Sequence, residues 1–275
     1  MKLEIGFSPC PNDTFIFDAL VHQRIDTKGY QFEPILADVE TLNRWAMKST
    51  LPITKLSYHG FLRVTDQYVM CRAGGALGFG VGPLLVTKDP EIFLSQKSPI
   101  VLLPGEYTTA HLLFKLAYPQ YSNKHFVPFH QIENLILSHE ADAGVIIHEN
   151  RFTYAQKGLH LIKDLGAWWE EETKLPIPLG GIAFSKRLPK QNSIEIAELI
   201  RHSIEYAFQN PDASSAYVLQ HAQEMDESVR RQHINLYVNS YSLDVSEIGI
   251  QAVTQMAIRL SGLDGLKLDT NKLFL

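Results

Sequence analysis

Short apolar runs alternate with segments of helical period along most of this 275-residue chain. The first run, Leu3 to Phe7, alternates like a strand, and a loop rich in proline, asparagine and aspartate follows from Ser8 to Asp13. Helical spacing then continues through Phe17 and Leu20. This succession is typical of βα units packed around mostly parallel sheets, and it predicts an α/β protein.

A second βα unit follows the first directly. Tyr30 to Ala37 has the pattern of a strand, and Asp38 is placed to cap a helix that contains Leu42 and Trp45. Leu51 to Leu56 has the pattern of a further strand. The first part of the chain is therefore predicted to have βαβαβ topology.

Two later segments resemble each other and indicate a division into lobes. Gly82 to Lys88 and Gly181 to Lys186 are apolar runs that begin with glycine and end in a hydroxyl residue and a lysine. We interpret them as two crossover strands, although both could be ordinary strands of one domain. The insert between them has its own strands and helix, predicted at Ile100 to Leu103, Ala143 to Ile147 and about Thr109 to Tyr118.

The predicted organisation is therefore two α/β lobes. Residues 1–86 form the first part of lobe 1, residues 87–183 form lobe 2, and residues 184–275 return to lobe 1. The returning part is mainly helical, because apolar residues there recur at helical spacing from Ile194 to Phe208, Ala213 to His221, Glu227 to Val238 and Val245 to Leu260.

Charge and composition narrow the partners. The net charge of -5 comes without a long basic or acidic run, which argues against nucleic acid and against an anionic membrane, and favours a small ligand. The only cysteines, Cys10 and Cys71, do not have metal-ligand spacing, so no metal is expected. No apolar stretch approaches the ~18 residues of a membrane span, and Glu4 interrupts any signal-like start, so a cytoplasmic protein is expected.

Three loops follow predicted strands, where open α/β sheets place their ligand crevice. The first, Ser8 to Thr14, is stiffened by prolines, and its Asn12 or Asp13 is suited to helix capping, ligand contact or both. The second, Pro104 to Ala110, precedes a predicted helix and places Thr108 or Thr109 at its start.

A helix start offers unpaired N–H groups and a partial positive charge, so the turn Thr108, Thr109, Ala110 is predicted to bind a carboxylate or a phosphate. Simple capping by threonine is the alternative. Lys55, Leu56 and Ser57 end another predicted strand and would add charge and a hydroxyl to the same crevice, unless the lysine is merely solvated.

The third loop ends the buried run Ala143 to Ile147 with His148 and Glu149. Histidine titrates near neutrality, so His148 is the candidate proton-transferring residue. His59 and His111 are reserve candidates near the crevice, whereas His202, His221 and His233 fall on the predicted closing helices. Adjacent strand residues point to opposite faces, so Glu149 is expected to be exposed rather than to orient the imidazole.

Five motifs, in order, give the chain a resemblance to the 1,4-dihydroxy-6-naphthoate synthases of the futalosine route to menaquinone. They are the segments Ser8 to Leu20, Lys55 to Ser57, Gly78 to Pro83, Thr108 to Ala110 and Ala143 to Glu149. The likeness runs from the first strand to beyond Phe184, whereas the C-terminal helices match mainly in pattern.

The resemblance implies a periplasmic-binding-protein-like fold of the second type, used as a cytoplasmic enzyme without a metal or organic cofactor. It implies a lyase that converts cyclic dehypoxanthine futalosine to 1,4-dihydroxy-6-naphthoate and dihydroxyacetone. The family's base falls on His148, and its substrate contacts fall on Lys55 to Ser57 and on Thr108 to Ala110. A solute-binding or sensor protein of the same fold, and the related chorismate-dehydrating enzyme, are the alternatives.

Overall fold

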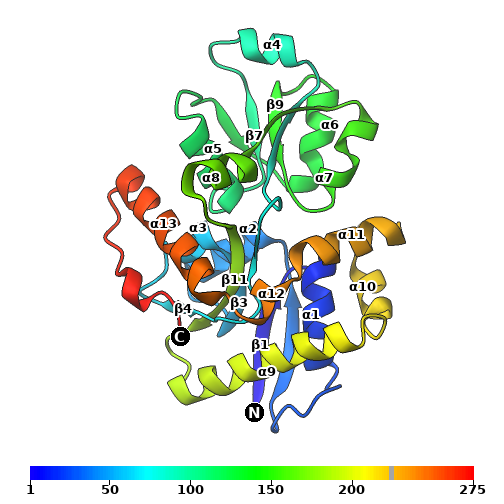
Figure 1. Cartoon of the computed structure of the whole chain (residues 1–275), viewed down its shortest axis with the longest axis vertical. Coiled ribbons are helices and arrows are strands. Elements are labelled where there is room, and N and C mark those ends of the chain that lie inside the picture. Colours follow the sequence, from blue (N-terminus) through cyan, green and yellow to red (C-terminus); the bar gives the residue numbers. More distant parts are fainter. Residues whose placement is uncertain (223–225) are drawn as a thin grey trace.

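The computed structural model describes residues 1–222 and 226–275, and it consists of two α/β lobes, each built on its own sheet (Figure 1). The first sheet has the strand order β2-β1-β3-β11-β4, and β5 pairs with β11. Its strands are β1 (Lys2–Phe7), β2 (Gln31–Leu36), β3 (Ile53–Ser57), β4 (Tyr68–Met70), β5 (Ala76–Gly78) and β11 (Ile177–Ser185).

The second sheet has the order β10-β6-β9-β7-β8. Its strands are β6 (Leu84–Thr87), β7 (Val101–Leu103), β8 (Lys124–Phe126), β9 (Ala143–Ile146) and β10 (His160–Asp164). In Figure 1 this sheet lies in the upper lobe together with the helices that join its strands.

Both sheets are mixed, so the expectation of mostly parallel sheets is wrong. β1 is parallel to β2 and β3, and β7 is parallel to β8 and β9. β11 is antiparallel to β3, β4 and β5, and β6 is antiparallel to β9 and β10. β6 and β11 each follow a passage of the chain from one lobe to the other. A helix that joins two neighbouring strands of one sheet makes them parallel, but a passage between lobes sets no such direction.

The predicted βαβαβ unit is confirmed. The helices that join its strands are α1 (Pro11–Val21) and α2 (Val39–Ala46). Asp38 caps α2 as predicted, since its carboxylate accepts the N–H groups of Glu40 and Thr41. α1 begins inside the predicted loop, because Pro11 has no N–H to satisfy and its fixed φ suits the first helical turn.

The helices of the second lobe and its borders are short. They are α3 (Tyr58–Phe61), α4 (Pro90–Ser95), α5 (Thr109–Ala117), α6 (Ile132–Leu137), α7 (Asn150–Thr153) and α8 (Leu165–Thr173), with 3₁₀ turns at Phe129–Gln131 and Tyr154–Lys157. The predicted helix at Thr109 corresponds to α5, and the threonine before it, Thr108, is its N-cap.

The C-terminal part is helical and packs on the first lobe. Its helices are α9 (Lys190–Gln209), α10 (Ser215–His221), α11 (Glu227–Tyr237), α12 (Ser240–Leu243) and α13 (Ser246–Asp264), followed by a 3₁₀ turn at Thr270–Lys272. Buried Ser203 fixes α9 against α1: its hydroxyl accepts the Leu20 N–H at 3.1 Å and donates to the Ile16 carbonyl at 2.6 Å.

The chain changes sheets between β5 and β6 and again between β10 and β11. The Gly82 segment therefore contains β6 of the second sheet, whereas the Gly181 segment is part of β11 in the first sheet. The division at residues 86/87 and 183/184 stays a prediction. No described helix combines the length and the hydropathy that crossing a bilayer requires.

Candidate active site between the lobes

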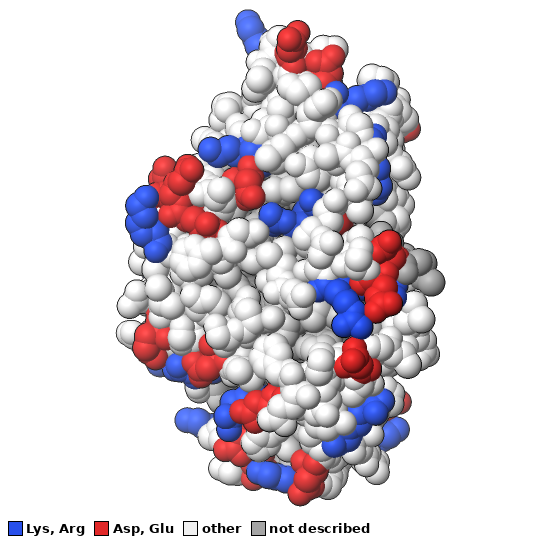
Figure 2. Space-filling model, turned by 45° about the vertical axis from the view of Figure 1, so that its right-hand side comes forward, with Lys and Arg blue, Asp and Glu red and all other residues white. Residues whose placement is uncertain are grey.

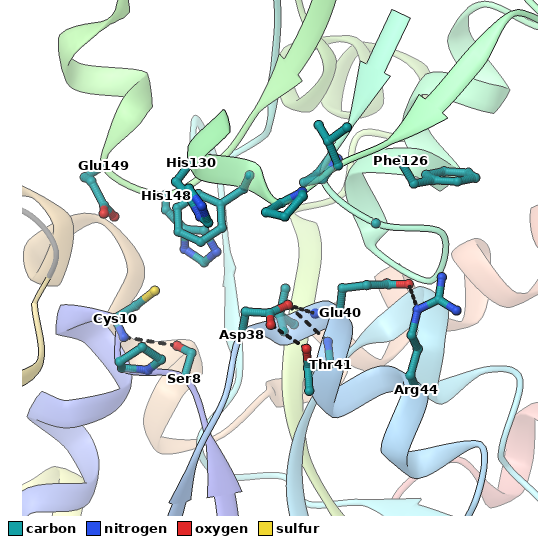
Figure 3. Close-up of a pocket in the computed structure, with 17 residues that line it drawn as sticks. Ser8, Cys10, Asp38, Glu40, Thr41, Arg44, Phe126, His130, His148 and Glu149 are labelled. Atoms are coloured by element: carbon teal, nitrogen blue, oxygen red, sulfur yellow. Dashed lines mark hydrogen bonds and ion pairs between the residues drawn. The ribbon is translucent and has the colours of Figure 1, made fainter. Parts of the chain in front are cut away.

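Two adjoining cavities lie between the lobes. The outer one has a volume of about 470 Å³ and lies between the loop after β1 and α2 on one side and the loops after β7, β8 and β9 on the other. Figure 3 shows His148 and Glu149 entering it from the second lobe, opposite Ser8, Cys10 and Asp38 of the first. The inner cavity is about 100 Å³, and Ser8, Val39 and His148 line both.

The inner cavity brings together the predicted base and both predicted substrate-binding segments. Its lining residues include Lys55, Leu56, Ser57, Thr108, Thr109, Ala110 and His148. The structure therefore places these residues around one space, while their individual roles stay predictions.

Asn43 of α2 holds the two binding segments together. This fully buried amide donates to the Ser57 hydroxyl and to the Tyr107 carbonyl, both at 3.2 Å, and its oxygen accepts the Ser57 N–H at 3.0 Å. The end of β3 in the first lobe is thus linked to the turn before α5 in the second. Asn43 gave no signal in the sequence, because a polar residue inside a helix usually lies on its exposed face.

Lys55 is buried and paired rather than solvated. Its ammonium lies 3.0 Å from the Asp13 carboxylate and donates to the Gly74 carbonyl at 3.1 Å. Asp13 also accepts the hydroxyl and the N–H of Ser8, at 2.7 and 3.1 Å. The loop after β1 therefore wraps around a carboxylate whose charge is offset by a lysine.

The N-terminus of α5 combines capping with unpaired donors. Thr108 accepts the His111 N–H and donates to the Gly105 carbonyl, and Thr109 donates to the Leu179 carbonyl at 2.8 Å. Both hydroxyl protons are thus committed to the protein. The N–H groups of Thr109 and Ala110 have no hydrogen-bond partner among the described residues, so they are the donors of this turn that remain for an anion.

His148 lies where the two cavities meet. It follows β9 with a φ of 59°, a left-handed conformation that is uncommon for residues other than glycine. Its ring packs 4.9 Å from that of Phe129 and lies parallel to that of His233 at 6.0 Å, between centroids. Burial lowers the pKa of His148, although the nearby carboxylates of Glu149 and Asp13 oppose the shift.

Glu149 is buried, so the expectation that it is exposed is wrong. That expectation assumed strand alternation, but β9 ends at Ile146 and the positive φ of His148 reverses the chain before Glu149. Both side chains consequently line the outer cavity. The positive φ could not be read from the sequence, since nothing in the residue type requires it.

His233 of α11 is a functional candidate that the sequence did not distinguish from the other helical histidines. It is fully buried, lines the inner cavity beside His148, and bonds through Nε2 to the Asn12 amide oxygen at 2.9 Å. Burial and the neighbouring His148 hold its pKa well below the usual range. Its place in the site depends on how the C-terminal helices pack, which their apolar spacing leaves undetermined.

The reserve candidates His59 and His111 line neither cavity. His59 contacts the Thr108 carbonyl through Nδ1 and the Arg63 side chain through Nε2, and burial lowers its pKa to about 3. His111 contacts the Glu106 carbonyl at 2.7 Å. Both imidazoles therefore contact the turn before α5 on its side away from the cavities.

Cys10 completes the wall around His148. Its sulfur, a His148 nitrogen and a Glu149 oxygen lie within 4.8 Å of one another, the spacing at which such groups could surround a metal ion. Burial and the Glu149 charge raise the pKa of the Cys10 thiol well above its usual value, so it is held as a neutral thiol rather than as the thiolate that metals bind. We assign no metal to these residues.

Charged side chains are dispersed over the face of the molecule shown in Figure 2. On the face shown in Figure 2, basic side chains occur in small groups beside acidic ones. Among the lining residues, the Arg44 guanidinium is 2.9 Å from Glu40 and 3.2 Å from Glu106, so it joins α2 to the turn before α5.

Comparison with known proteins supplies the family. The sequence profile of a menaquinone-biosynthesis family matches residues 3–261. A 1,4-dihydroxy-6-naphthoate synthase of Thermus thermophilus is 47% identical over 92% of this chain and 92% of its own length. The enzyme of that name from Streptomyces coelicolor is 40% identical over 94% of this chain and 92% of its own.

Solved structures agree on the architecture. A protein of Archaeoglobus fulgidus superposes with a TM-score of 0.89 at 33% identity, covering 97% of this chain and 98% of its own. The periplasmic aliphatic sulphonate binding protein of Escherichia coli superposes with a TM-score of 0.67 at 10% identity, covering 100% of this chain and 92% of its own. The fold is thus periplasmic-binding-protein-like, as predicted, and the chain belongs to the menaquinone-biosynthesis family.

Proposed function

We propose that this protein is a 1,4-dihydroxy-6-naphthoate synthase, a carbon–carbon lyase that divides cyclic dehypoxanthine futalosine into 1,4-dihydroxy-6-naphthoate and dihydroxyacetone. The similarity to the two synthases over more than nine-tenths of the chain supports the reaction. The observation that carries the proposal is the position of His148, which lines both cavities. The inner cavity is also lined by Thr109 and Ala110, whose N–H groups are unpaired among the described residues.

In this proposal the turn Thr108 to Ala110 holds the substrate carboxylate. The free N–H groups of Thr109 and Ala110 lie at the positive end of α5. Backbone N–H groups can bind an anion there without the burial of another charged side chain. Lys55, Leu56 and Ser57 form another part of the cavity wall. Lys55 is already paired with Asp13, so it contributes mainly to shaping this wall.

His148 is the base in this proposal. It removes an activated proton from the sugar-derived ring, the carbon skeleton then cleaves, and formation of the aromatic naphthoate drives the reaction. Burial favours the neutral imidazole that a base requires. A general base typically contributes ~10²- to 10⁴-fold, so positioning within the enclosed space between the lobes supplies the remainder.

The proposal also places the enzyme in the cytoplasm, acting on a small carboxylate without nucleic acid or membrane as a partner. It is tested by incubating the purified full chain with cyclic dehypoxanthine futalosine and, separately, with chorismate, and by following the products by mass spectrometry. We expect naphthoate and dihydroxyacetone from the first substrate and no dehydration of the second. Tight binding of either compound without turnover would instead identify a solute-binding or sensor protein.

A further inference from the structure

Two buried polar atoms face each other across the lobe boundary beside His148. Oε2 of Glu149, from the second lobe, lies 3.7 Å from Nδ1 of His233, from α11 on the first. Neither atom has a hydrogen-bond partner among the described residues, although Glu149 is only 7% exposed and His233 is 0% exposed. Buried polar atoms are normally paired, so this arrangement requires an explanation.

The hydrogen bonds around His233 fix its tautomer. The Asn12 amide nitrogen donates to Asp13 at 2.9 Å, so its oxygen is the atom that faces Nε2 of His233, also at 2.9 Å. Nε2 must therefore carry a hydrogen. In the neutral ring Nδ1 then has only a lone pair, and this lone pair faces a carboxylate oxygen. Two acceptors meet with no hydrogen between them.

A single added proton would satisfy both atoms, either as imidazolium and carboxylate or as imidazole and carboxylic acid. We propose that Glu149 and His233 share one proton in the closed, substrate-bound enzyme and act as a positioning pair that keeps His148 neutral. This inference rests on the proposed function of His148 as the base. The pair also joins the lobes, because its members come from opposite sides of the cleft.

The charge of Glu149 explains why sharing matters. An unshared carboxylate beside His148 stabilises the imidazolium, which cannot accept a proton. The shared proton makes the pair neutral overall and removes that stabilisation, while the parallel ring of His233 still packs against His148.

The other groups that face His148 leave Glu149 as the charge that decides. The Asp13 carboxylate is offset by Lys55 at 3.0 Å, and the Asp38 carboxylate, which caps α2, favours the charged form of His148 less than Glu149 does. Two further groups lie nearby: the Arg151 guanidinium, 3.6 Å from the Asp164 carboxylate, and His130, which lines the outer cavity. Burial raises the pKa of Tyr237 to about 12 and that of the Cys10 thiol well above its usual value, so both stay neutral.

The test is the pH dependence of kcat in four proteins: wild type, His233→Asn, Glu149→Gln and the double variant. His233→Asn leaves Glu149 charged, so the acidic limb should move up by about one pH unit, the lower end of the effect of an adjacent opposite charge. Glu149→Gln and the double variant carry no such charge, so their limbs should stay at the wild-type pH. A merely structural role would lower kcat without this pattern.

His22→Asn is the matched control. His22 also faces a carboxylate, that of Asp18 at 2.8 Å, but it lines neither cavity, so its replacement should leave the limb in place. A folded His233→Asn with an unmoved limb, or a Glu149→Gln limb that moves as far as that of His233→Asn, would overturn the proposal. Failure of the base assignment itself is distinguishable, since His148→Asn would then keep its turnover.

A second measurement serves if His233→Asn does not fold. Nitrogen NMR of histidine-labelled wild type with bound 1,4-dihydroxy-6-naphthoate reports whether Nδ1 of His233 is protonated or hydrogen-bonded. We expect both ring nitrogens of His233 to show a shared or bound proton. A bare Nδ1 in the product complex would refute the pair.

Discussion

Gly82 and Gly166 lie backbone against backbone where the chain passes between the lobes. A Cβ on Gly82 would come within 2.2 Å of the Gly166 Cα, and one on Gly166 within 2.6 Å of the Gly82 Cα. Gly82 belongs to the passage from β5 to β6, and Gly166 to the passage from β10 to β11. The two connections therefore touch, and the Leu165 N–H donates to the Pro83 carbonyl at 2.9 Å beside them.

Gly82→Ala should separate the two passages and disturb lobe closure. Real Cβ atoms do not approach other atoms this closely, and the obstacle is backbone rather than a flexible side chain. We expect a loss of about 1 to 3 kcal/mol in the free energy of unfolding, typical of overpacking. In solution scattering the wild type should contract when saturated with substrate or product, and the variant should contract less.

Gly262→Ala is the control for this prediction. Gly262 lies in α13, and apart from the backbone of its own helix and its chain neighbours a Cβ added there would meet no described atom within 4 Å. Alanine should therefore be neutral or stabilising by up to about 1 kcal/mol. A Gly82→Ala protein that is as stable as wild type and contracts normally would contradict the prediction. It would show that the two connections between the lobes can move apart without loss of stability.

Replacing Thr109 in two ways separates its hydroxyl from its N–H. Thr109→Val removes the hydrogen bond to the Leu179 carbonyl but keeps the N–H. Thr109→Pro removes both, and it suits this position because proline is favoured at the first helical residue and Thr108 is already extended. If the N–H binds the carboxylate, Thr109→Pro should bind product about ten- to hundredfold more weakly than Thr109→Val, measured by calorimetry.

Both variants should be less stable than wild type by a similar ~1 kcal/mol, since both leave the Leu179 carbonyl unpaired. That shared loss makes Thr109→Val the reference for folding. Equal product affinity in the two variants would move the carboxylate site away from α5.

His59 should make the fold sensitive to acid. Histidine titrates near 6.5 when unfolded, whereas burial lowers the pKa of folded His59 to about 3. Between these values the unfolded chain binds a proton that the folded chain does not, so stability falls as the pH falls from 6.5, by about 1.4 kcal/mol per pH unit. At pH 5 the loss from this residue should be about 2 kcal/mol.

The measurement is urea unfolding of wild type and His59→Gln at pH 7 and pH 5. Glutamine does not titrate, so the variant should lose about 2 kcal/mol less than wild type between the two pH values. Histidines that do not contact His59 contribute equally to both proteins. An identical loss in the two would mean that His59 is protonated inside the fold.

The parts of the fold that could be predicted from the sequence are those fixed by local pattern. The alternation of Leu3 to Phe7, the cap at Asp38 and the threonine before α5 each act within a few residues, and each lies where expected. The direction of β6 and β11 could not be predicted, because strand direction depends on which lobe the chain has just left and not on the residues of the strand.

The site divides in the same way. The segments Lys55 to Ser57 and Thr108 to Ala110 could be placed near one crevice, because each follows a strand. Asn43 and His233 could not, since their roles arise from contacts with residues 64 and 221 positions away in the chain. The burial of Glu149 could not be predicted either, because one positive φ, at His148, ends the strand alternation.

His148→Asn tests the base, and the backbone makes asparagine the suitable replacement. His148 has a φ of 59°, which asparagine tolerates better than most residues, so the chain reversal before Glu149 should survive. Asparagine also keeps a polar side chain while removing the group that titrates near neutrality. If His148 is the base, turnover should fall by at least the ~10²-fold typical of losing one, with melting temperature and product affinity little changed.

A structural role for His148 predicts a different result. The variant would then lose about 1 to 3 kcal/mol of stability, and the protein that remains folded would keep near-normal turnover. Turnover per folded molecule is therefore measured beside a thermal melt and over a pH series. Burial lowers the pKa of His148, so the neutral base persists below the usual histidine range, and wild-type activity should fall only at a pH below about 6.5. The residual activity of the variant should lack this acidic limb.

Retention of more than about a tenth of wild-type turnover would remove His148 from the mechanism, since even the smallest usual general-base effect is larger. His233, the other imidazole lining the inner cavity, would then be the next candidate for the base, because His59 and His111 line neither cavity.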